Sequence, residues 1–404
     1  MLPLDGITVV SLEQAVAGPF ATRQLADLGA RVIKIERTGA GDFARGYDRT
    51  VLGQSSYFVW LNRSKESVAL DLKDARGRQI VSRLVAGSDV FLQNLAPGAC
   101  KRLGFDDSSL ARDHPSLIVC SLSGYGSDGP WADRKAYDLL VQSEVGLLSL
   151  TGTEQSVAKV GVSIADIAAG MYAFSAILAS LYQRAVTGRG SLIDLSMFEA
   201  LSEWIGAQMY YTMYSGAQPQ RTGADHATIA PYGPFVTSDG KTVVIAIQND
   251  REWESFCKNV LTDEQLVTDE RFADNPARSH NREALRKLIE DRLRALSGSE
   301  VEDLLADAGI ATAEVNLVEQ FLRHPVLSGR NRWRKVETPR GVVTALVPPG
   351  IPVGAEPVMG PVPAVGQHTE AVLAELGLSD QDIGALKADG VVSVPSARSA
   401  GGGR

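Results

Sequence analysis

The first 125 residues alternate between strand-like and helix-like patterns. Short runs of β-branched and other apolar residues lie at residues 7–12, 31–36, 67–72, 90–92 and 117–122. Apolar residues recur at helical spacing between these runs, as in residues 19–28. Strands separated by helices of about ten residues predict crossover units and an α/β fold with a doubly wound, mostly parallel sheet. Ligands bind such sheets at the carboxyl ends of the strands. The loops at that edge follow Leu12, Glu36, Leu92 and Leu122.

The second half of the chain has a different pattern. Residues 166–184 predict a long buried helix, and residues 234–237 and 242–247 flank a Ser-Asp-Gly-Lys turn that is typical of a β-hairpin. Charged amphipathic helices follow, and the spacing of Ser299 and Glu302 predicts a capping box. We therefore expect a smaller α+β domain at residues 226–322, after a linker at residues 201–225.

Composition and charge narrow the class of protein. The 404 residues carry 40 basic and 48 acidic side chains, a formal net charge of −8, which argues against nucleic acid or an anionic membrane as the main partner. The three cysteines form no CxxC pair and the five histidines show no metal-binding spacing. No signal-peptide pattern is visible at the start, and the uncharged stretch at residues 167–183 is short for a membrane span. These features predict a cytoplasmic protein without a metal site.

The first candidate site is the turn between the first strand and its helix. Glu36 follows Gly18 by 18 residues, close to dinucleotide-binding spacing, but the GxGxxG pattern is missing. A nicotinamide or flavin dinucleotide, a turn that serves packing only, and a different adenine nucleotide all remain open.

A second candidate is a set of cations and amides near the predicted loops. Its members are Arg37, Asn62, Arg63, Lys65, Asn94, Arg102 and Lys135. Each one alone is typical of a solvated surface, whereas together they favour a ligand with several phosphates.

The third candidate is Asp166, at the front of the long apolar helix. An aspartate there is often an N-cap, but a carboxylate held ionised by the helix dipole can also attack an activated acyl carbon. The small residues Ala165, Ala168, Ala169 and Gly170 leave room for a substrate. A fourth, weaker candidate is His226, near Arg221 and Tyr232 at the expected domain junction.

Several motifs together resemble family III CoA-transferases, the group that includes formyl-CoA transferase, carnitine CoA-transferase and α-methylacyl-CoA racemase. They are VAGP (16–19), LGARVIKIER (28–37), LNRSK (61–65), NLAPGA (94–99), GYG (124–126), GVSIAD (161–166) and TGRG (187–190). The resemblance covers nearly the whole chain in order and is weakest after residue 219.

The resemblance implies a fold and an assembly. Family members are homodimers whose two chains thread through each other. A Rossmann-like large domain would here combine residues 1–200 with a return segment at residues 323–385, leaving a disordered tail at residues 386–404.

The resemblance also implies site residues. The family's catalytic aspartate falls on Asp166, and CoA or acyl-CoA is a substrate, with no prosthetic group. The implied CoA contacts are Val16, Ala17, Arg37, Asn62, Lys65, Asn94, Leu95, Ala96, Arg102, Lys135 and Tyr137.

Two departures from the family patterns shape the expected reaction. The racemases' Gly-His-Asp segment reads Ala-Tyr-Asp at residues 136–138, so the acid/base pair for proton exchange is incomplete. The glycine-rich flap of formyl-CoA transferase is replaced by residues 223–232, which argues against formate and oxalate as the natural pair. We expect CoA transfer to a short dicarboxylic acid recognised by Arg221, His226 and Tyr232. The alternatives are an α-methylacyl-CoA racemase and a catalytically silent CoA-binding protein.

Overall fold

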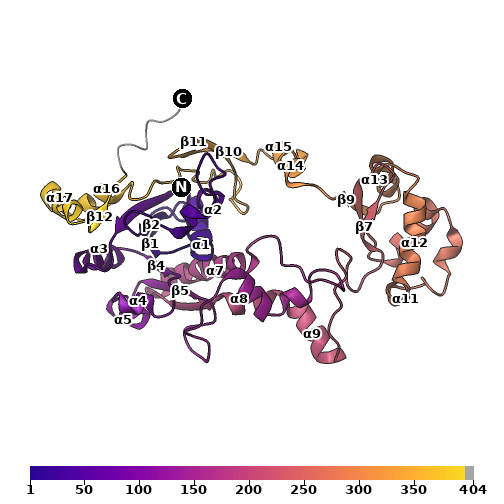
Figure 1. The fold of residues 1–404 in the computed structure, drawn as a ribbon, viewed down its shortest axis with the longest axis horizontal. Helices are drawn as coiled ribbons and strands as arrows, with labels where there is room; N and C mark the ends of the chain where they lie inside the picture. The colour runs from indigo at the N-terminus through magenta and orange to yellow at the C-terminus, as the bar shows by residue number, and fades with distance from the viewer. Residues whose placement is uncertain (396–404) are drawn as a thin grey trace. The chain divides into compact units, whose positions relative to one another are not determined.

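The computed structural model describes residues 1–395, which form two compact units (Figure 1). The first unit contains Met1–Val145, Val160–Gly206 and the described part of Arg330–Arg404. The second contains Gly146–Lys159 and Ala207–Gly329. The chain therefore leaves the first unit twice and returns to it, so each unit is built from separate stretches of sequence.

The first unit is organised around a seven-stranded sheet. Its strand order is β12-β3-β2-β1-β4-β5-β6, and every neighbouring pair is parallel except β12 with β3. The strands are β1 (Thr8–Leu12), β2 (Arg31–Glu36), β3 (Lys65–Leu70), β4 (Val90–Gln93), β5 (Ile118–Ser123), β6 (Leu192–Ser196) and β12 (Val392–Ser393). The order 3-2-1-4-5-6 is that of doubly wound nucleotide-binding sheets. The predicted parallel α/β sheet is confirmed.

Helices connect the strands and cover the sheet. They are α1 (Ala17–Asp27), α2 (Ser56–Leu61), α3 (Ala75–Ala86), α4 (Ala99–Arg102), α5 (Asp107–Asp113), α6 (Asp138–Glu144), α7 (Ile164–Thr187), α8 (Met197–Trp204), α16 (Thr369–Glu375) and α17 (Asp380–Ala388). The return segment also forms a hairpin of β10 (Trp333–Thr338) and β11 (Gly341–Leu346).

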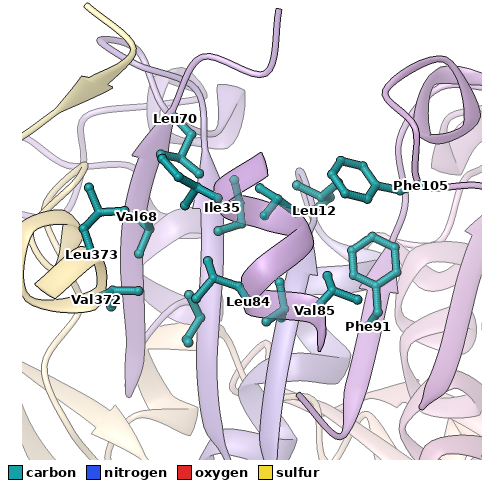
Figure 2. Packing of buried hydrophobic residues seen from close by; sticks show 14 of the residues in the cluster. Leu12, Ile35, Val68, Leu70, Leu84, Val85, Phe91, Phe105, Val372 and Leu373 are labelled. Carbon is teal, nitrogen blue, oxygen red and sulfur yellow. The ribbon is translucent and has the colours of Figure 1, made fainter. Parts of the chain in front are cut away.

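One face of the sheet is apolar. Figure 2 shows Leu84 and Val85 of α3 over the side chains of Leu12 and Ile35, and Leu373 of α16 beside Val68. Because α16 belongs to the return segment, the C-terminal part of the chain completes this core.

The opposite face carries buried polar side chains on the first three strands. Successive side chains of a strand alternate between faces, so Lys34 and Glu36 lie opposite Ile33 and Ile35, which belong to the apolar core. Helices α1 and α7 pack against each other in this unit.

The second unit is a small α+β body. Its antiparallel sheet has the order β7-β8-β9, formed by β7 (Tyr232–Val236), β8 (Thr242–Ala246) and β9 (Ala311–Glu314). Its helices are α10 (Asp250–Ser255), a π-helical turn (Phe256–Leu261), α11 (Asn275–His280), α12 (Arg282–Leu293), α13 (Gly298–Asp307), α14 (Val318–Phe321) and α15 (Pro325–Gly329). The helix α9 (Gly206–Ser215) follows α8 and begins at the border of the units.

Two local predictions differ from the structure. The capping box pairs Ser297 with Glu300 rather than Ser299 with Glu302, because α13 begins at Gly298. The predicted disordered tail begins too early, since α17 and β12 occupy part of residues 386–395 and β12 pairs with β3. Residues 396–404 of that tail lie outside the described part of the chain.

The uncharged stretch at residues 167–183 belongs to helix α7, which is longer than the stretch itself, so the prediction that it is too short for a membrane span is wrong. With 24 residues, α7 is long and apolar enough to cross a membrane by length and composition alone, the one such helix among the described residues. In the first unit, α7 packs against α1, α6, α8, β5 and β6.

Candidate functional site

Asp166 lies in the first turn of α7, on a partly buried stretch of the helix. Ser163 occupies the N-cap position, so the N-cap interpretation of Asp166 is wrong. An acidic residue in the first turn still interacts favourably with the helix dipole. The carboxyl group is therefore available for a role other than capping the backbone.

A second carboxyl group stands at the same end of α7. Asp138, the first residue of α6, accepts a hydrogen bond from the Ala165 N–H at 2.8 Å and another from the Gln142 amide at 2.7 Å. Asp138 thus supplies the capping contact that α7 lacks from its own N-cap side chain.

These surroundings raise the pKa of Asp166 to about 7. Burial is the largest cause and the charge of Asp138 the second, while a backbone hydrogen bond from Ala17 acts in the opposite direction. Sequence reasoning expected the helix dipole to keep Asp166 ionised. Instead, burial and the neighbouring carboxylate place its titration near neutral pH.

The small residues around Asp166 serve packing rather than access. Ala165, Ala168 and Ala169 are fully buried, and a Cβ added to Gly170 would lie 2.8 Å from the Ala17 carbonyl oxygen. Gly170 therefore allows the start of α1 to approach α7 closely. The predicted open space is filled by α1, and this approach brings Ala17 to Asp166.

The turn between β1 and α1 is held by hydrogen bonds from other loops. The Asn94 amide accepts from the Gln14 N–H at 2.8 Å and donates to the Gln14 carbonyl at 2.9 Å. Val16 and Ala17, two predicted CoA contacts, are buried in this turn and at the start of α1. Asn94 is a predicted CoA contact as well, so its side chain already joins two of the loops expected to form the site.

The remaining predicted contacts follow the carboxyl ends of the strands. Arg37 comes directly after β2 and is exposed, and Leu95 and Ala96 follow β4. Arg102 at the end of α4 is exposed, and its guanidinium donates to the Pro97 carbonyl at 3.3 Å. Lys135 and Tyr137, both exposed, lie between β5 and α6. Topology thus brings these residues to one edge of the sheet, as strand order requires.

Lys65 and Asn62 do not fit the predicted phosphate site. Lys65 begins β3 and pairs in register with Val32, near the amino end of β2, away from the edge that carries Arg37. Its buried ammonium contacts Glu13 Oε1 at 2.7 Å, the Pro19 carbonyl at 3.0 Å and Asn62 Oδ1 at 3.2 Å. These three acceptors use its three donors. In this structure both side chains hold the protein's own loops, which argues against a direct phosphate contact, and their role as CoA contacts stays a prediction.

Two further residues, Tyr47 and its neighbour Tyr57, were not among the predicted site residues. Burial is the largest cause that raises the pKa of Tyr47 to about 12. Smaller contributions come from its neighbours Asp42, Asp166, Tyr137 and Tyr57. Tyr47 is half exposed. Neither Tyr47 nor Tyr57 belongs to a periodic pattern, so the sequence offered no signal for them. Asp138 ends the Ala-Tyr-Asp segment at residues 136–138, but the interpretation of that segment used only its missing histidine.

The predicted acceptor residues lie in the second unit. His226 is exposed and its ring stacks on Tyr232, with centroids 5.2 Å apart and an interplanar angle of 13°. The Arg221 guanidinium donates to the carbonyls of Thr153 at 2.7 Å and Glu154 at 2.9 Å. The structure thus joins His226 to Tyr232, whereas two Arg221 donors already bind the backbone.

Comparisons with known proteins assign the family. The sequence model of CoA-transferase family III matches residues 4–369. Human succinyl-CoA:glutarate CoA-transferase is 32% identical, with 96% of this chain and 90% of that protein covered. Acetyl-CoA:oxalate CoA-transferase of Acetobacter aceti is 37% identical, with 81% of this chain and 85% of that protein covered. The crystal structure of a CAIB/BAIF family protein from Brucella suis, 36% identical, superposes with a TM-score of 0.82 over 93% of this chain and 99% of that one. The chain belongs to CoA-transferase family III.

Proposed function

We propose that this enzyme transfers CoA from an acyl-CoA donor to a short dicarboxylic acid, with Asp166 as the nucleophile. The observation that carries the proposal is the close approach of the start of α1 to the first turns of α7, where a Cβ added to Gly170 would lie 2.8 Å from the Ala17 carbonyl oxygen. Ala17 is among the predicted CoA contacts, so the reactive carboxylate stands next to the turn expected to bind the thioester.

The reaction runs through two covalent intermediates on Asp166. The carboxylate attacks the thioester carbonyl, the C–S bond breaks, and CoA leaves as a thiolate from an aspartyl–acyl anhydride. The thiolate then attacks the Asp166 carbonyl, which releases the donor acid and leaves an aspartyl–CoA thioester. The acceptor carboxylate attacks that thioester to form a second anhydride, and the released thiolate attacks the acceptor carbonyl to regenerate Asp166.

Each tetrahedral intermediate needs hydrogen-bond donors for its oxyanion. The Ala17 N–H is one candidate, because it already faces the carboxylate that becomes acylated. The raised pKa of Asp166 also fits a nucleophile, since a desolvated carboxylate is less well stabilised before attack.

Two observations favour a dicarboxylic acceptor. The human relative is named for glutarate and the Acetobacter aceti relative for oxalate, and both are dicarboxylates. The second name also keeps oxalate among the acceptors to be assayed, despite the replaced flap. His226 is our candidate for the second carboxylate because its exposed ring is held by Tyr232.

We also propose that the enzyme functions as an interlocked homodimer. No residue of α9 is buried, although the helix carries Met209, Tyr210, Tyr211, Met213 and Tyr214. An apolar and aromatic helix without a covered face favours association with a second copy of the chain. Light scattering at micromolar concentration tests this: the mass of two chains is expected, and the mass of one chain contradicts the assembly.

The acceptor proposal is tested with succinyl-CoA and acids of matched length, read by mass spectrometry of the new CoA ester. We expect succinate-, glutarate- or oxalate-type acids to react and butyrate to be poor, because a monocarboxylate cannot make the contact that the second carboxylate makes with its partner. The change His226→Ala should slow the dicarboxylates selectively, with Trp333→Ala, in the other unit, as a control. Equal rates for butyrate and succinate contradict the acceptor class. Rapid exchange of the α-proton of a 2-methylacyl-CoA without any acceptor favours the racemase alternative.

A further inference from the structure

The turn Glu13–Ala17 holds a conformation that its sequence does not favour. Ala15 has a φ of 62°, in the left-handed region that side chains other than glycine adopt at a cost. Its N–H donates to Asp42 Oδ1 at 3.1 Å, and the same oxygen accepts from Ala44 N–H at 2.9 Å. Asp42, a residue 27 positions away in sequence, therefore fixes the strained residue of the turn.

Asp42 is itself locked in place. Its other oxygen, Oδ2, accepts from Lys34 Nζ at 2.7 Å, and its N–H donates to Glu36 Oε2 at 2.8 Å. The side chains of Lys34 and Asp42 are fully buried. The Lys34 ammonium also contacts Asn62 Oδ1 at 3.0 Å and Glu13 Oε1 at 3.5 Å. A carboxylate with partners on both oxygens and on its own backbone cannot turn away from Ala15.

The buried charges around this pair balance each other. Burial alone would lower the pKa of Lys34, but the carboxylates of Asp42, Glu13 and Glu36 outweigh it and leave that pKa raised. Burial likewise opposes the ionisation of Glu36, yet Arg45 and Lys34 lower its pKa to about 2. Lys34 and Glu36 therefore stay charged at neutral pH.

The position of Ala17 depends on the turn that Asp42 fixes. Ala17 follows Ala15 by two residues and begins α1, and its carbonyl oxygen lies against Gly170, where an added Cβ would be only 2.8 Å away. Because this packing is close, even a small displacement of the turn changes the contact between α1 and α7. Ala17 is only two residues from Ala15, so a shift at Ala15 moves the Ala17 N–H relative to Asp166.

We propose that Asp42, locked by Lys34, is a positioning residue of the transferase: it holds Ala15 in the left-handed conformation and thereby sets the Ala17 N–H against the Asp166 carboxylate. This inference rests on the proposed role of Asp166 as the nucleophile. Asp42 itself touches no reacting atom, and its effect should appear in the rate at which Asp166 is acylated.

The test compares two aspartates in buried ion pairs, one next to the residues before α1 and the other at its last residue. Asp42→Asn removes the charge that faces Lys34 and Ala15. The matched control is Asp27→Asn, because Asp27 is equally buried, binds Arg63 at 2.7 and 2.8 Å, and lies at the last residue of α1, about 15 Å from its start. Acyl-CoA and hydroxylamine are added to each full-length variant, and the rate of hydroxamate formation at Asp166 is followed by mass spectrometry, corrected for the folded fraction.

We expect Asp42→Asn to slow the acylation of Asp166 by about tenfold to a hundredfold relative to Asp27→Asn, since small misplacements at a reacting centre cost about that much. The Michaelis constant for the acceptor should change little. Equal acylation rates in the two variants overturn the proposal and reduce Asp42 to a structural residue.

Two changes at Ala15 keep the proposal testable if Asp42→Asn does not fold. Ala15→Val leaves every buried charge in place but disfavours the left-handed conformation, so acylation should slow. Ala15→Gly reaches that conformation freely, and in combination with Asp42→Asn it should recover about fivefold of the lost rate. A wild-type rate for Ala15→Val, or no recovery with Ala15→Gly, overturns the proposal. Retained transfer by Asp166→Ala would instead overturn the proposed function itself, so the two failures are distinguishable.

Discussion

Asp138 and Asp166 are two carboxyl groups at one helix end, and the first raises the pKa of the second. Asp138 holds the Ala165 N–H at 2.8 Å, one residue before Asp166, and its charge is the largest cause of the raised pKa after burial. The capping contact of α7 and the electrostatic tuning of Asp166 thus depend on the same side chain.

The pH dependence of transfer should follow from this pair. Only the ionised Asp166 can attack, and its pKa is about 7, so kcat/KM should rise as the pH increases through about 7 and then level off. Asp138→Asn keeps an oxygen for the Ala165 N–H but removes the charge, so the rise should move to lower pH. Asp74→Asn, the same change at the N-cap of α3, is the control. An unmoved profile in Asp138→Asn would show that Asp138 does not tune Asp166.

Stability should respond to Asp166 in the opposite sense to activity. The pKa of this group is raised from 3.8 in the unfolded chain to about 7, so the folded state binds more protons between these values and stability falls as the pH rises from about 4 to 7. Asp166→Asn removes that penalty. At pH 8 its free energy of unfolding should exceed that of wild type by about 2 kcal/mol after allowance for solvent screening. The difference should vanish near pH 4, and a variant less stable at pH 8 contradicts the pKa.

The predicted phosphate contacts are tested on the exposed arginines. Arg37→Ala and Arg102→Ala should each weaken CoA binding about tenfold to a hundredfold, because a charged hydrogen bond contributes about 1.5–3 kcal/mol. The loss should be largest at low salt. Arg112→Ala, at an exposed arginine paired with Asp113 on α5, serves as the control in titration calorimetry. Affinities that match the control would place CoA elsewhere.

Lys65 should behave as a structural charge. Lys65→Met leaves Glu13 buried without its 2.7 Å partner, so the free energy of unfolding should fall by about 3–5 kcal/mol. The folded fraction should bind CoA with wild-type affinity. Denaturant unfolding and calorimetry on the same sample separate the two effects, and a stable variant with weak CoA binding would restore the original phosphate prediction.

The fold was largely predictable because its strongest signals are local. Residues 31–36 form β2 with the predicted bounds, since the β-branched residues Val32, Ile33 and Ile35 follow a glycine that ends the preceding helix. By contrast, Val336 is the one β-branched apolar residue of β10, which lies on a half-exposed hairpin, and β12 is two residues long. Neither pattern differs from an irregular connection in the sequence.

The site was predictable only where position follows from topology. Arg37 and Arg102 could be placed because parallel strands bring their carboxyl ends to one edge. Lys65 could not, because its partner Glu13 is 52 residues away and nothing local shows that the ammonium is buried. Asp138 was likewise hidden, since its role depends on the approach of α6 to α7.

Trapping the acylated enzyme tests the central claim most directly. Wild-type enzyme is incubated with acyl-CoA and hydroxylamine, digested, and analysed by mass spectrometry for an aspartyl hydroxamate, with Asp166→Ala and enzyme without acyl-CoA as controls. The proposed mechanism predicts a hydroxamate at Asp166 that requires acyl-CoA, and a folded Asp166→Ala variant that binds CoA but transfers none. An unmodified Asp166, or transfer that survives Asp166→Ala, would contradict it.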